Sequence, residues 1–207
     1  MELIGSADQP AYAMTDSSGT VNLGGNPDHY NIKWDGATLT LNGANVTGGY
    51  SYIDYYGDPS SAAIYCDGDM QILLVGENSV TGFPTDSEFN NGIAAKGDLT
   101  ISGSGSLKAT GGYDGIATQN GDLTILSGDV MAEGGSGGIS TYEGNLTISG
   151  GEVTATGNGS YYDVSSEVNV SYGFYIDGDC TISGGKVTIT AQADFPYITR
   201  AYGMYIF

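Results

Sequence analysis

At 207 residues, the chain is long enough for one domain with a continuous core, and its 35 glycines, 11% aromatic residues and 14% charged residues exclude a disordered or a mainly helical chain. Acidic residues outnumber basic ones 24 to 5, which gives a formal net charge of -19. Nucleic acid and anionic membranes are therefore poor partners, because both are bound by clustered Lys and Arg. The sequence shows neither a signal peptide nor an apolar run near the roughly 20 residues of a membrane span.

Residues 1–33 precede the first repeat and are predicted to be an N-terminal cap segment. A cap is expected because the open end of stacked strands would pair with other chains. His29 is the only histidine and has no cysteine near it. We therefore expect His29 to be a cap or turn residue rather than a zinc ligand.

Residues 34–207 are predicted to be a repeat domain. Three copies align directly at 92–114, 115–137 and 138–160, looser copies begin at Ala63 and Gly173, and partial copies lie at Trp34 and at 203–207. Each copy predicts three short strands of alternating apolar and polar residues, separated by Gly and Asp turns. Because one copy cannot bury its own apolar face, the copies are predicted to stack as an all-β solenoid of about six coils, with three strands per coil.

Equivalent positions of the stacked copies are predicted to form columns. The inward column of the first strand is Ile64, Ile93, Ile116, Ile139 and Phe174. The inward column of the second strand begins Leu39, Met70, Leu99, and that of the third begins Val46, Val80, Leu107. The outward column of the first strand has small residues between tyrosines: Tyr65, Ala94, Ala117, Ser140, Tyr175 and Tyr205.

The two cysteines are predicted to be buried free thiols that pack as small hydrophobic side chains. Cys66 and Cys180 belong to copies four coils apart, which at about 4.8 Å per coil separates them by roughly 19 Å. A disulfide needs Cα atoms within about 7 Å of each other.

The repeated segment Gly-Asp-Leu-Thr-Ile, followed by Gly-x-Val-x-Ala, resembles the right-handed parallel β-helix repeats of bacterial surface proteins in the pectate-lyase-like class. It is most similar to the non-catalytic carbohydrate-binding β-helix proteins of plant-fibre-degrading bacteria. The resemblance covers residues 34–207 and implies a single-stranded right-handed parallel β-helix at an extracellular or cell-surface location. Lyases of this class use an Arg or Lys base beside calcium. Arg200 is the only arginine and lies in the last coil, so no catalytic residue is assigned.

Loop lengths predict where a ligand binds. The loops after the third strand are long at 48–62 and 82–91, short at 111–114 and 134–137, and long again at 157–172 and 191–202, which gives two walls with a saddle between them. Sugar rings stack on aromatic faces and hydrogen-bond to phenol hydroxyls. The predicted carbohydrate-binding residues are Tyr56, Tyr65, Tyr113, Tyr161, Tyr162 and Tyr175. The alternative is that these rings only pack the loops onto the coils.

Acidic residues in the same loops predict an optional calcium site. The candidate ligands are Asp54, Asp58, Asp86 and Asp114. Calcium accepts about six to eight oxygen ligands in irregular geometry. No EF-hand or nonapeptide calcium repeat accompanies them, and acidity that merely keeps an exported protein soluble is the alternative explanation.

Three functions remain open at this point. The first is a non-catalytic extracellular module that binds polysaccharide or a cell-surface glycan in the saddle, with calcium as an optional ligand. The second is a structural stalk or adhesin segment that contacts protein partners through its Tyr-rich loops. The third is a polysaccharide lyase or glycosidase, because two well-placed carboxylates among 24 acidic residues would suffice for glycoside hydrolysis.

Overall fold

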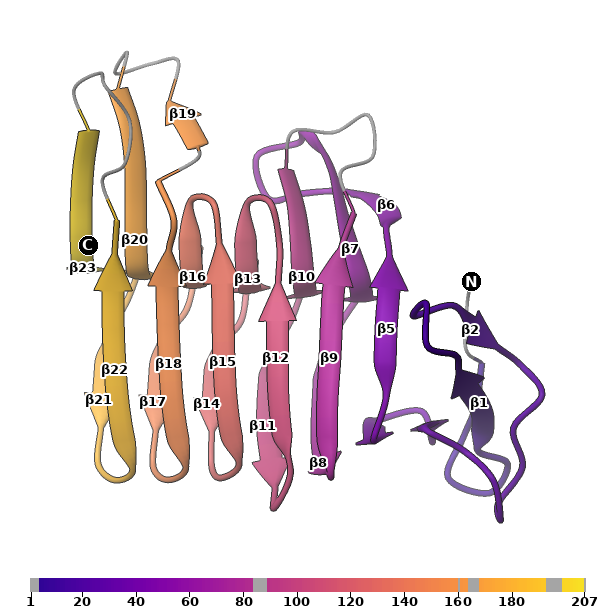
Figure 1. Cartoon of the computed structure of the whole chain (residues 1–207). Helices are drawn as coiled ribbons and strands as arrows, with labels where there is room; N and C mark the ends of the chain where they lie inside the picture. Colours follow the sequence, from indigo (N-terminus) through magenta and orange to yellow (C-terminus); the bar gives the residue numbers. More distant parts are fainter. Residues whose placement is uncertain (1–3, 84–88, 160, 164–167, 193–198, 207) are drawn as a thin grey trace.

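The computed structural model describes residues 4–83, 89–159, 161–163, 168–192 and 199–206, and it is all-β (Figure 1). The described residues contain no helix, and accordingly none that is long and apolar enough to cross a membrane. The Gly- and Asp-rich turns of the sequence separate short strands, as the repeat pattern predicts.

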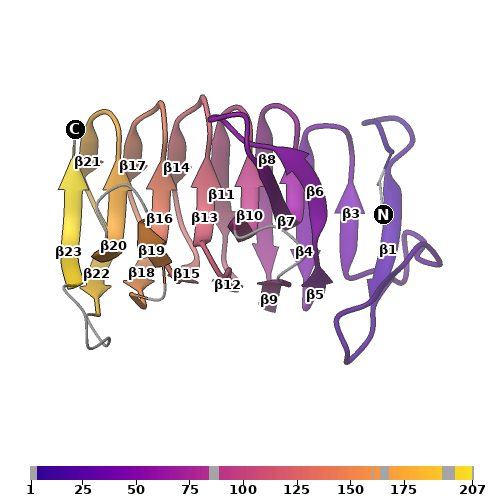
Figure 2. The same cartoon turned by 90° about the horizontal axis from the view of Figure 1, so that it is seen from above.

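In the described ranges the strands form three sheets (Figures 1 and 2). The nine-stranded sheet has the order β2 (Val21–Asn22), β1 (Ala11–Thr15), β3 (Ile32–Trp34), β4 (Thr38–Asn42), β8 (Met70–Val75), β11 (Leu99–Gly103), β14 (Leu123–Ile125), β17 (Leu146–Ile148) and β21 (Cys180–Ile182). The six-stranded sheet has the order β22 (Lys186–Ala191), β18 (Glu152–Gly157), β15 (Asp129–Gly134), β12 (Ser106–Thr110), β9 (Glu77–Gly82) and β5 (Asn45–Gly48).

The eight-stranded sheet carries the candidate site. Its order is β19 (Tyr161–Asp163), β20 (Val168–Ile176), β16 (Gly137–Thr141), β13 (Asp114–Thr118), β10 (Phe89–Ala95), β7 (Pro59–Cys66) and β6 (Tyr50–Ile53), and β23 (Thr199–Ile206) also pairs with β20. The hairpin strands β6 and β19 pair antiparallel with their neighbours, whereas the pairs from β7 to β20 and from β20 to β23 are parallel.

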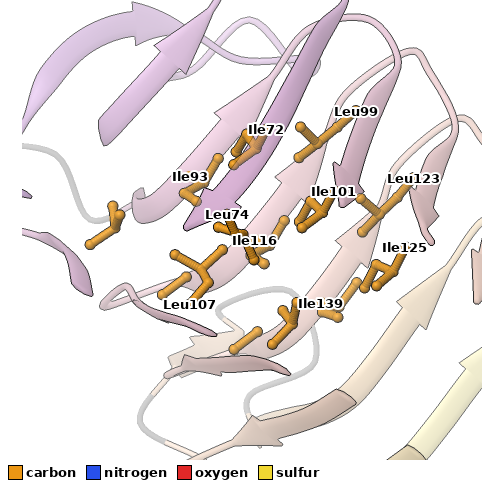
Figure 3. Close-up of a cluster of buried hydrophobic side chains, with 14 of the residues drawn as sticks. Ile72, Leu74, Ile93, Leu99, Ile101, Leu107, Ile116, Leu123, Ile125 and Ile139 are labelled. Atoms are coloured by element: carbon orange, nitrogen blue, oxygen red, sulfur yellow. The ribbon is translucent and has the colours of Figure 1, made fainter. Parts of the chain in front are cut away.

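The predicted first-strand columns are confirmed. Ile93 pairs with Ile64 on one side and with Ile116 on the other, and the inward column continues through Ile139 to Phe174. The outward column likewise continues in register from Tyr65 to Tyr205. Ile93, Ile116 and Ile139 are fully buried, and their side chains follow one another through the interior in Figure 3.

Two predicted columns are wrong by two residues in the early repeats. Leu39 pairs with Ile72 rather than Met70, and Val80 pairs with Ala109 rather than Leu107. The position opposite Leu107 belongs to Asn78. A buried amide is tolerated there because Asn78 Oδ1 accepts the main-chain N–H of Ala44 at 2.9 Å, and its Nδ2 donates to three carbonyl oxygens.

The N-terminal residues extend the nine-stranded sheet. Strand β1 pairs antiparallel with β3, and β3 pairs antiparallel with β4 (Figure 2). Ala13 and Ile32 are buried in the same apolar core as the repeats. The predicted boundary between the cap segment and the repeat domain, after residue 33, falls inside β3 (Ile32–Trp34). This domain boundary stays a prediction.

Both cysteines are free thiols, as predicted, but they are half-buried rather than buried. Cys66 ends β7 in the eight-stranded sheet, and Cys180 begins β21 in the nine-stranded sheet.

Candidate functional site

A cleft of about 450 Å³ lies between the outward face of the eight-stranded sheet and the hairpin formed by β6 and β7. We call it the tyrosine cleft. Its lining residues are Tyr52, Asp54, Tyr55, Tyr56, Asp58, Ser60, Phe89, Asn91, Tyr113, Ala117, Gln119, Tyr142 and Tyr175.

Small side chains make room for this cleft. Ala94, Ala117 and Ser140 lie in register in the outward column between Tyr65 and Tyr175. All three are buried, although they lie on the outward face of the sheet. The short turns beside them depend on glycine, because a Cβ on Gly111 would overlap the carbonyl oxygen of Asp114.

The β6–β7 hairpin is held in place by its own turn and by a distant repeat. Asp54 Oδ1 accepts the main-chain N–H groups of Tyr56 and Asp58, each at 2.9 Å, and Asp54 Oδ2 accepts the hydroxyl of Ser60 at 3.0 Å. Tyr55 donates its hydroxyl to Glu143, which follows β16. The hairpin therefore crosses over the eight-stranded sheet (Figure 2). The saddle that the loop lengths predicted is thus a cleft beneath the hairpin rather than an open gap.

The tyrosine rings contact one another across the cleft. The Tyr56 ring lies edge-on to the ring of Tyr142, with centroids 6.0 Å apart, and Tyr142 lies 5.6 Å from Tyr175. On the other side, Phe89 meets Tyr113 edge-on at 4.9 Å. Tyr56 is 64% exposed and Tyr55 is 41% exposed, so both rings offer free surface to a ligand.

A hydrogen-bond network fixes the floor of the cleft. Tyr142 donates its hydroxyl to Asp114 Oδ2 at 2.6 Å, and the main-chain N–H of Asp114 donates to Asn91 Oδ1 at 3.0 Å. Asn91 Nδ2 in turn donates to the Tyr52 hydroxyl at 2.7 Å. The Asn91 and Asp114 side chains are buried, so these bonds hold the surrounding rings in one arrangement.

Burial dominates the electrostatics of this floor. It raises the pKa of the Asp114 carboxyl from its ordinary 3.8 to about 7, against the hydrogen bond from Tyr142, which lowers it. Burial also raises the pKa values of Tyr52, Tyr142 and Tyr175 above their ordinary value. These phenols consequently keep their protons near neutral pH and can donate hydrogen bonds.

Among the residues that the structure describes, those that line the tyrosine cleft include no Lys or Arg. Three of the chain's lysines instead form ion pairs outside it: Lys96 with Asp67, Lys108 with Glu133, and Lys186 with Glu152. The cleft therefore presents phenols, carboxylates and amides, which are groups that recognise hydroxylated ligands.

The structure brings together three of the six predicted carbohydrate-binding residues, namely Tyr56, Tyr113 and Tyr175. Tyr65 stacks on Tyr52 with ring centroids 4.2 Å apart, but it lines a different cavity. Tyr161 and Tyr162 form β19 with Asp163, and β19 pairs with β20. Their side chains are outside the described part of the chain.

The predicted calcium ligands do not form a metal site among the described residues. Asp54 and Asp58 line the tyrosine cleft, whereas Asp114 is buried beneath it, and Asp86 lies outside the described residues. In the described ranges, no group of three or more His, Cys, Asp or Glu could hold a metal ion. Both oxygens of Asp54 already accept hydrogen bonds within the hairpin. Calcium stays an untested prediction.

Sequence reasoning missed three polar or aromatic residues, one within β10 and two directly after β13 and β16. Asn91, Gln119 and Tyr142 line the cleft but were not predicted as site residues. A signal was present, because Gln119 and Tyr142 each come two residues after the outward positions Ala117 and Ser140. Side chains two apart on a strand share a face, so these two extend the outward column.

A family model described as "Carbohydrate-binding domain-containing protein" matches residues 16–196. No curated protein and no solved structure matches the chain. The matched segment contains all the described residues that line the tyrosine cleft.

Proposed function

We propose that this chain, which belongs to the family of carbohydrate-binding domain-containing proteins, is a non-catalytic module. In this proposal it binds a polysaccharide chain in the tyrosine cleft. The observation that carries the proposal is the cleft itself, in which exposed rings lie beside fixed polar side chains. Sugar rings pack their C–H faces on such rings and exchange hydrogen bonds with phenols, amides and carboxylates.

The scaffold in this proposal is a single-stranded right-handed parallel β-helix of about six coils, with three strands per coil. Its support is that the middle repeats give one strand to each sheet. Residues 115–137, for example, supply β13, β14 and β15 to three different sheets. A rigid stack of this kind holds the floor of the cleft at a constant height along several strands.

In the proposal the module acts outside the cell at a bacterial surface, and its partner is a polysaccharide or a surface glycan. A net charge of -19 is compatible with this setting, because it keeps an exported protein soluble. The absence of Lys and Arg among the cleft residues supports a binding role over lyase chemistry, which needs a basic side chain beside the substrate.

The decisive experiment is a pull-down with insoluble cellulose, xylan and gelled polygalacturonate, followed by a binding isotherm for the glycan retained. We expect Tyr56→Ala to weaken binding about tenfold, which corresponds to about 1.4 kcal/mol for one lost stacking surface. The matched control is Tyr30→Ala, which removes a ring that packs on Tyr12, outside the cleft. Equal affinity of the Tyr56 variant and the wild type would remove the cleft from the proposal.

A second experiment separates binding from catalysis. The wild-type protein is incubated with each retained glycan, and reducing ends and unsaturated products are measured over time. We expect no increase over a protein-free control. A rise that Asp114→Asn abolishes would instead support the glycosidase alternative, because a buried carboxyl with a pKa near 7 suits a general acid.

A further inference from the structure

A second cavity lies at the N-terminal end of the stack. Its volume is about 340 Å³. Its walls are mostly apolar and come from seven strands and one turn: Val21, Ile32, Trp34, Leu39, Val46, Tyr50, Ala63, Ile64, Tyr65, Cys66, Asp67 and Met70.

The cavity has a topological cause. Strand β7 has eight residues, but its hairpin partner β6 pairs only with the first four, Pro59–Ala62. No described strand pairs with residues 63–66 on that side, although β10 pairs with them on the other. The two other sheets do continue past this point, because β4 lies beside β8 and β5 lies beside β9. The described part of the first repeat thus supplies only two of the three strands of a coil.

The missing strand leaves both apolar surface and a strand edge uncovered. Ile64 is only half-buried, whereas Ile93 and Ile116, its neighbours in the same column, are fully buried. Main-chain groups alternate in direction along a strand, and the carbonyl of Cys66 faces β10, where it accepts the N–H of Lys96. The main-chain groups of Ala63 and Tyr65 therefore face the cavity side.

We infer that this cavity receives an extended peptide segment, which adds to β7 as a parallel strand in register with the column. Main-chain hydrogen bonds to an open sheet edge supply affinity, and a pocket beside that edge selects the side chain. The chain itself shows which pattern fits this column, because Gly115–Thr118 reads Gly-Ile-Ala-Thr and Gly138–Thr141 reads Gly-Ile-Ser-Thr. The partner is accordingly a protein segment with an aliphatic residue opposite Ile64 and small residues on either side. This inference is independent of the tyrosine cleft.

Cys66 allows the register to be tested by chemical trapping. In the inferred register, the peptide residue two positions after the aliphatic one lies opposite Cys66. Neighbouring strands lie about 4.8 Å apart, which is close enough for a disulfide to join these two residues. The probe is blocked Gly-Ile-Ser-Cys, supplied as a mixed disulfide with thionitrobenzoate. The Cys66 thiolate attacks the peptide sulfur, a new disulfide forms, and thionitrobenzoate leaves with the electron pair of the broken bond.

The two thiols of the chain serve as site and control. Burial raises the pKa of both Cys66 and Cys180, so neither thiol is activated by its surroundings. Mass spectrometry of digested protein gives the labelling rate of each. We expect Gly-Ile-Ser-Cys to label Cys66 at least about tenfold faster than Gly-Asp-Ser-Cys does, while Cys180 reacts at the same rate with both peptides. Ile64→Trp, which fills the cavity, is expected to remove the preference at Cys66 only.

Equal labelling of Cys66 by the two peptides would overturn the inference. A small-molecule site is the competing outcome, and the neutral probe N-phenyl-1-naphthylamine detects it. Trp34 lines the cavity and is the only tryptophan of the chain, so energy transfer from it reports that probe. Probe binding without discrimination between the peptides would identify a site for apolar small molecules instead of a strand-binding site.

Discussion

At the scale of single residues, Asp114 is the group that most sets this site apart from the rest of the repeat. Its carboxyl is fully buried, and it accepts the Tyr142 hydroxyl beneath the cleft. The equivalent position in the next repeat is Gly137, so the following coil supplies no second carboxylate beside it. Such a buried acid costs free energy when it is ionised, and this cost should be visible in the pH dependence of stability.

The prediction concerns Asp114→Asn. Burial raises the folded-state pKa of the Asp114 carboxyl from 3.8 to about 7. The unfolding free energy is therefore highest below about pH 4, where the carboxyl is protonated in both states, and it falls as the pH rises to about 7. Asparagine keeps an oxygen for Tyr142 and has no charge. Relative to wild type, the variant should gain on the order of a few kcal/mol in unfolding free energy between pH 4 and pH 8, at about 1.4 kcal/mol per pKa unit.

Urea unfolding of both proteins at the two pH values measures this difference. Asp58→Asn is the matched control, because Asp58 is an exposed acid of the same cleft. A constant difference between Asp114→Asn and wild type would show that the carboxyl does not titrate in this range.

Residue chemistry also explains one failure of sequence reasoning. Val80 and Leu107 look equivalent because both are apolar, yet the structure places Asn78 opposite Leu107. Alternation of apolar residues cannot reveal such a position, since the amide is acceptable only once its partners at Ala44, Val75, Gly76 and Ser106 are in place.

At the scale of elements, regular strands were predictable and the hairpin was not. Columns such as Ile93, Ile116 and Ile139 follow from a repeat spacing that stays constant over three copies. The β6–β7 hairpin was predicted only as a long loop of the first wall. Its path over the sheet depends on Tyr55 meeting Glu143, a contact between residues 88 positions apart. No local pattern encodes such a contact.

One column of the second strand allows the loss of a buried and of a half-exposed isoleucine to be compared within the same protein. Ile125 and Ile182 are equivalent residues of β14 and β21, but Ile125 is fully buried and Ile182 is 45% exposed. We expect Ile125→Ala to lower the unfolding free energy by about 2–5 kcal/mol, through lost burial and the cavity left behind. Ile182→Ala should cost less than about 1 kcal/mol. Chemical denaturation measures both, and equal losses would contradict the column.

At the scale of the whole molecule, the stacked architecture and the acidity were both evident from composition and repeats. The covering of the saddle was not, because it depends on the direction of one hairpin. The described structure contains few ion pairs to offset a net charge of -19, the observed ones being Lys96–Asp67, Lys108–Glu133 and Lys186–Glu152. Mutual repulsion of the remaining carboxylates should therefore destabilise the folded chain.

Screening that repulsion should stabilise the protein. We expect the midpoint temperature of thermal unfolding to rise steadily with sodium chloride, from about 0.01 M to about 0.5 M at neutral pH, because the Debye length shortens from about 30 Å to a few ångströms. Calorimetry in sodium chloride and in sucrose at matched osmolality separates charge screening from solute exclusion. A midpoint that falls with salt would mean that attractive ion pairs dominate.

The small outward residues beneath the hairpin have a consequence for how such modules diversify. Ala94, Ala117 and Ser140 face the cleft side of the sheet, while the apolar interior lies on the opposite side. Ala117 also lines the cleft, so a larger side chain there would raise the floor under the hairpin without entering the interior. The thickness of the ligand admitted is thereby adjustable at a single position, on a frame that does not have to change.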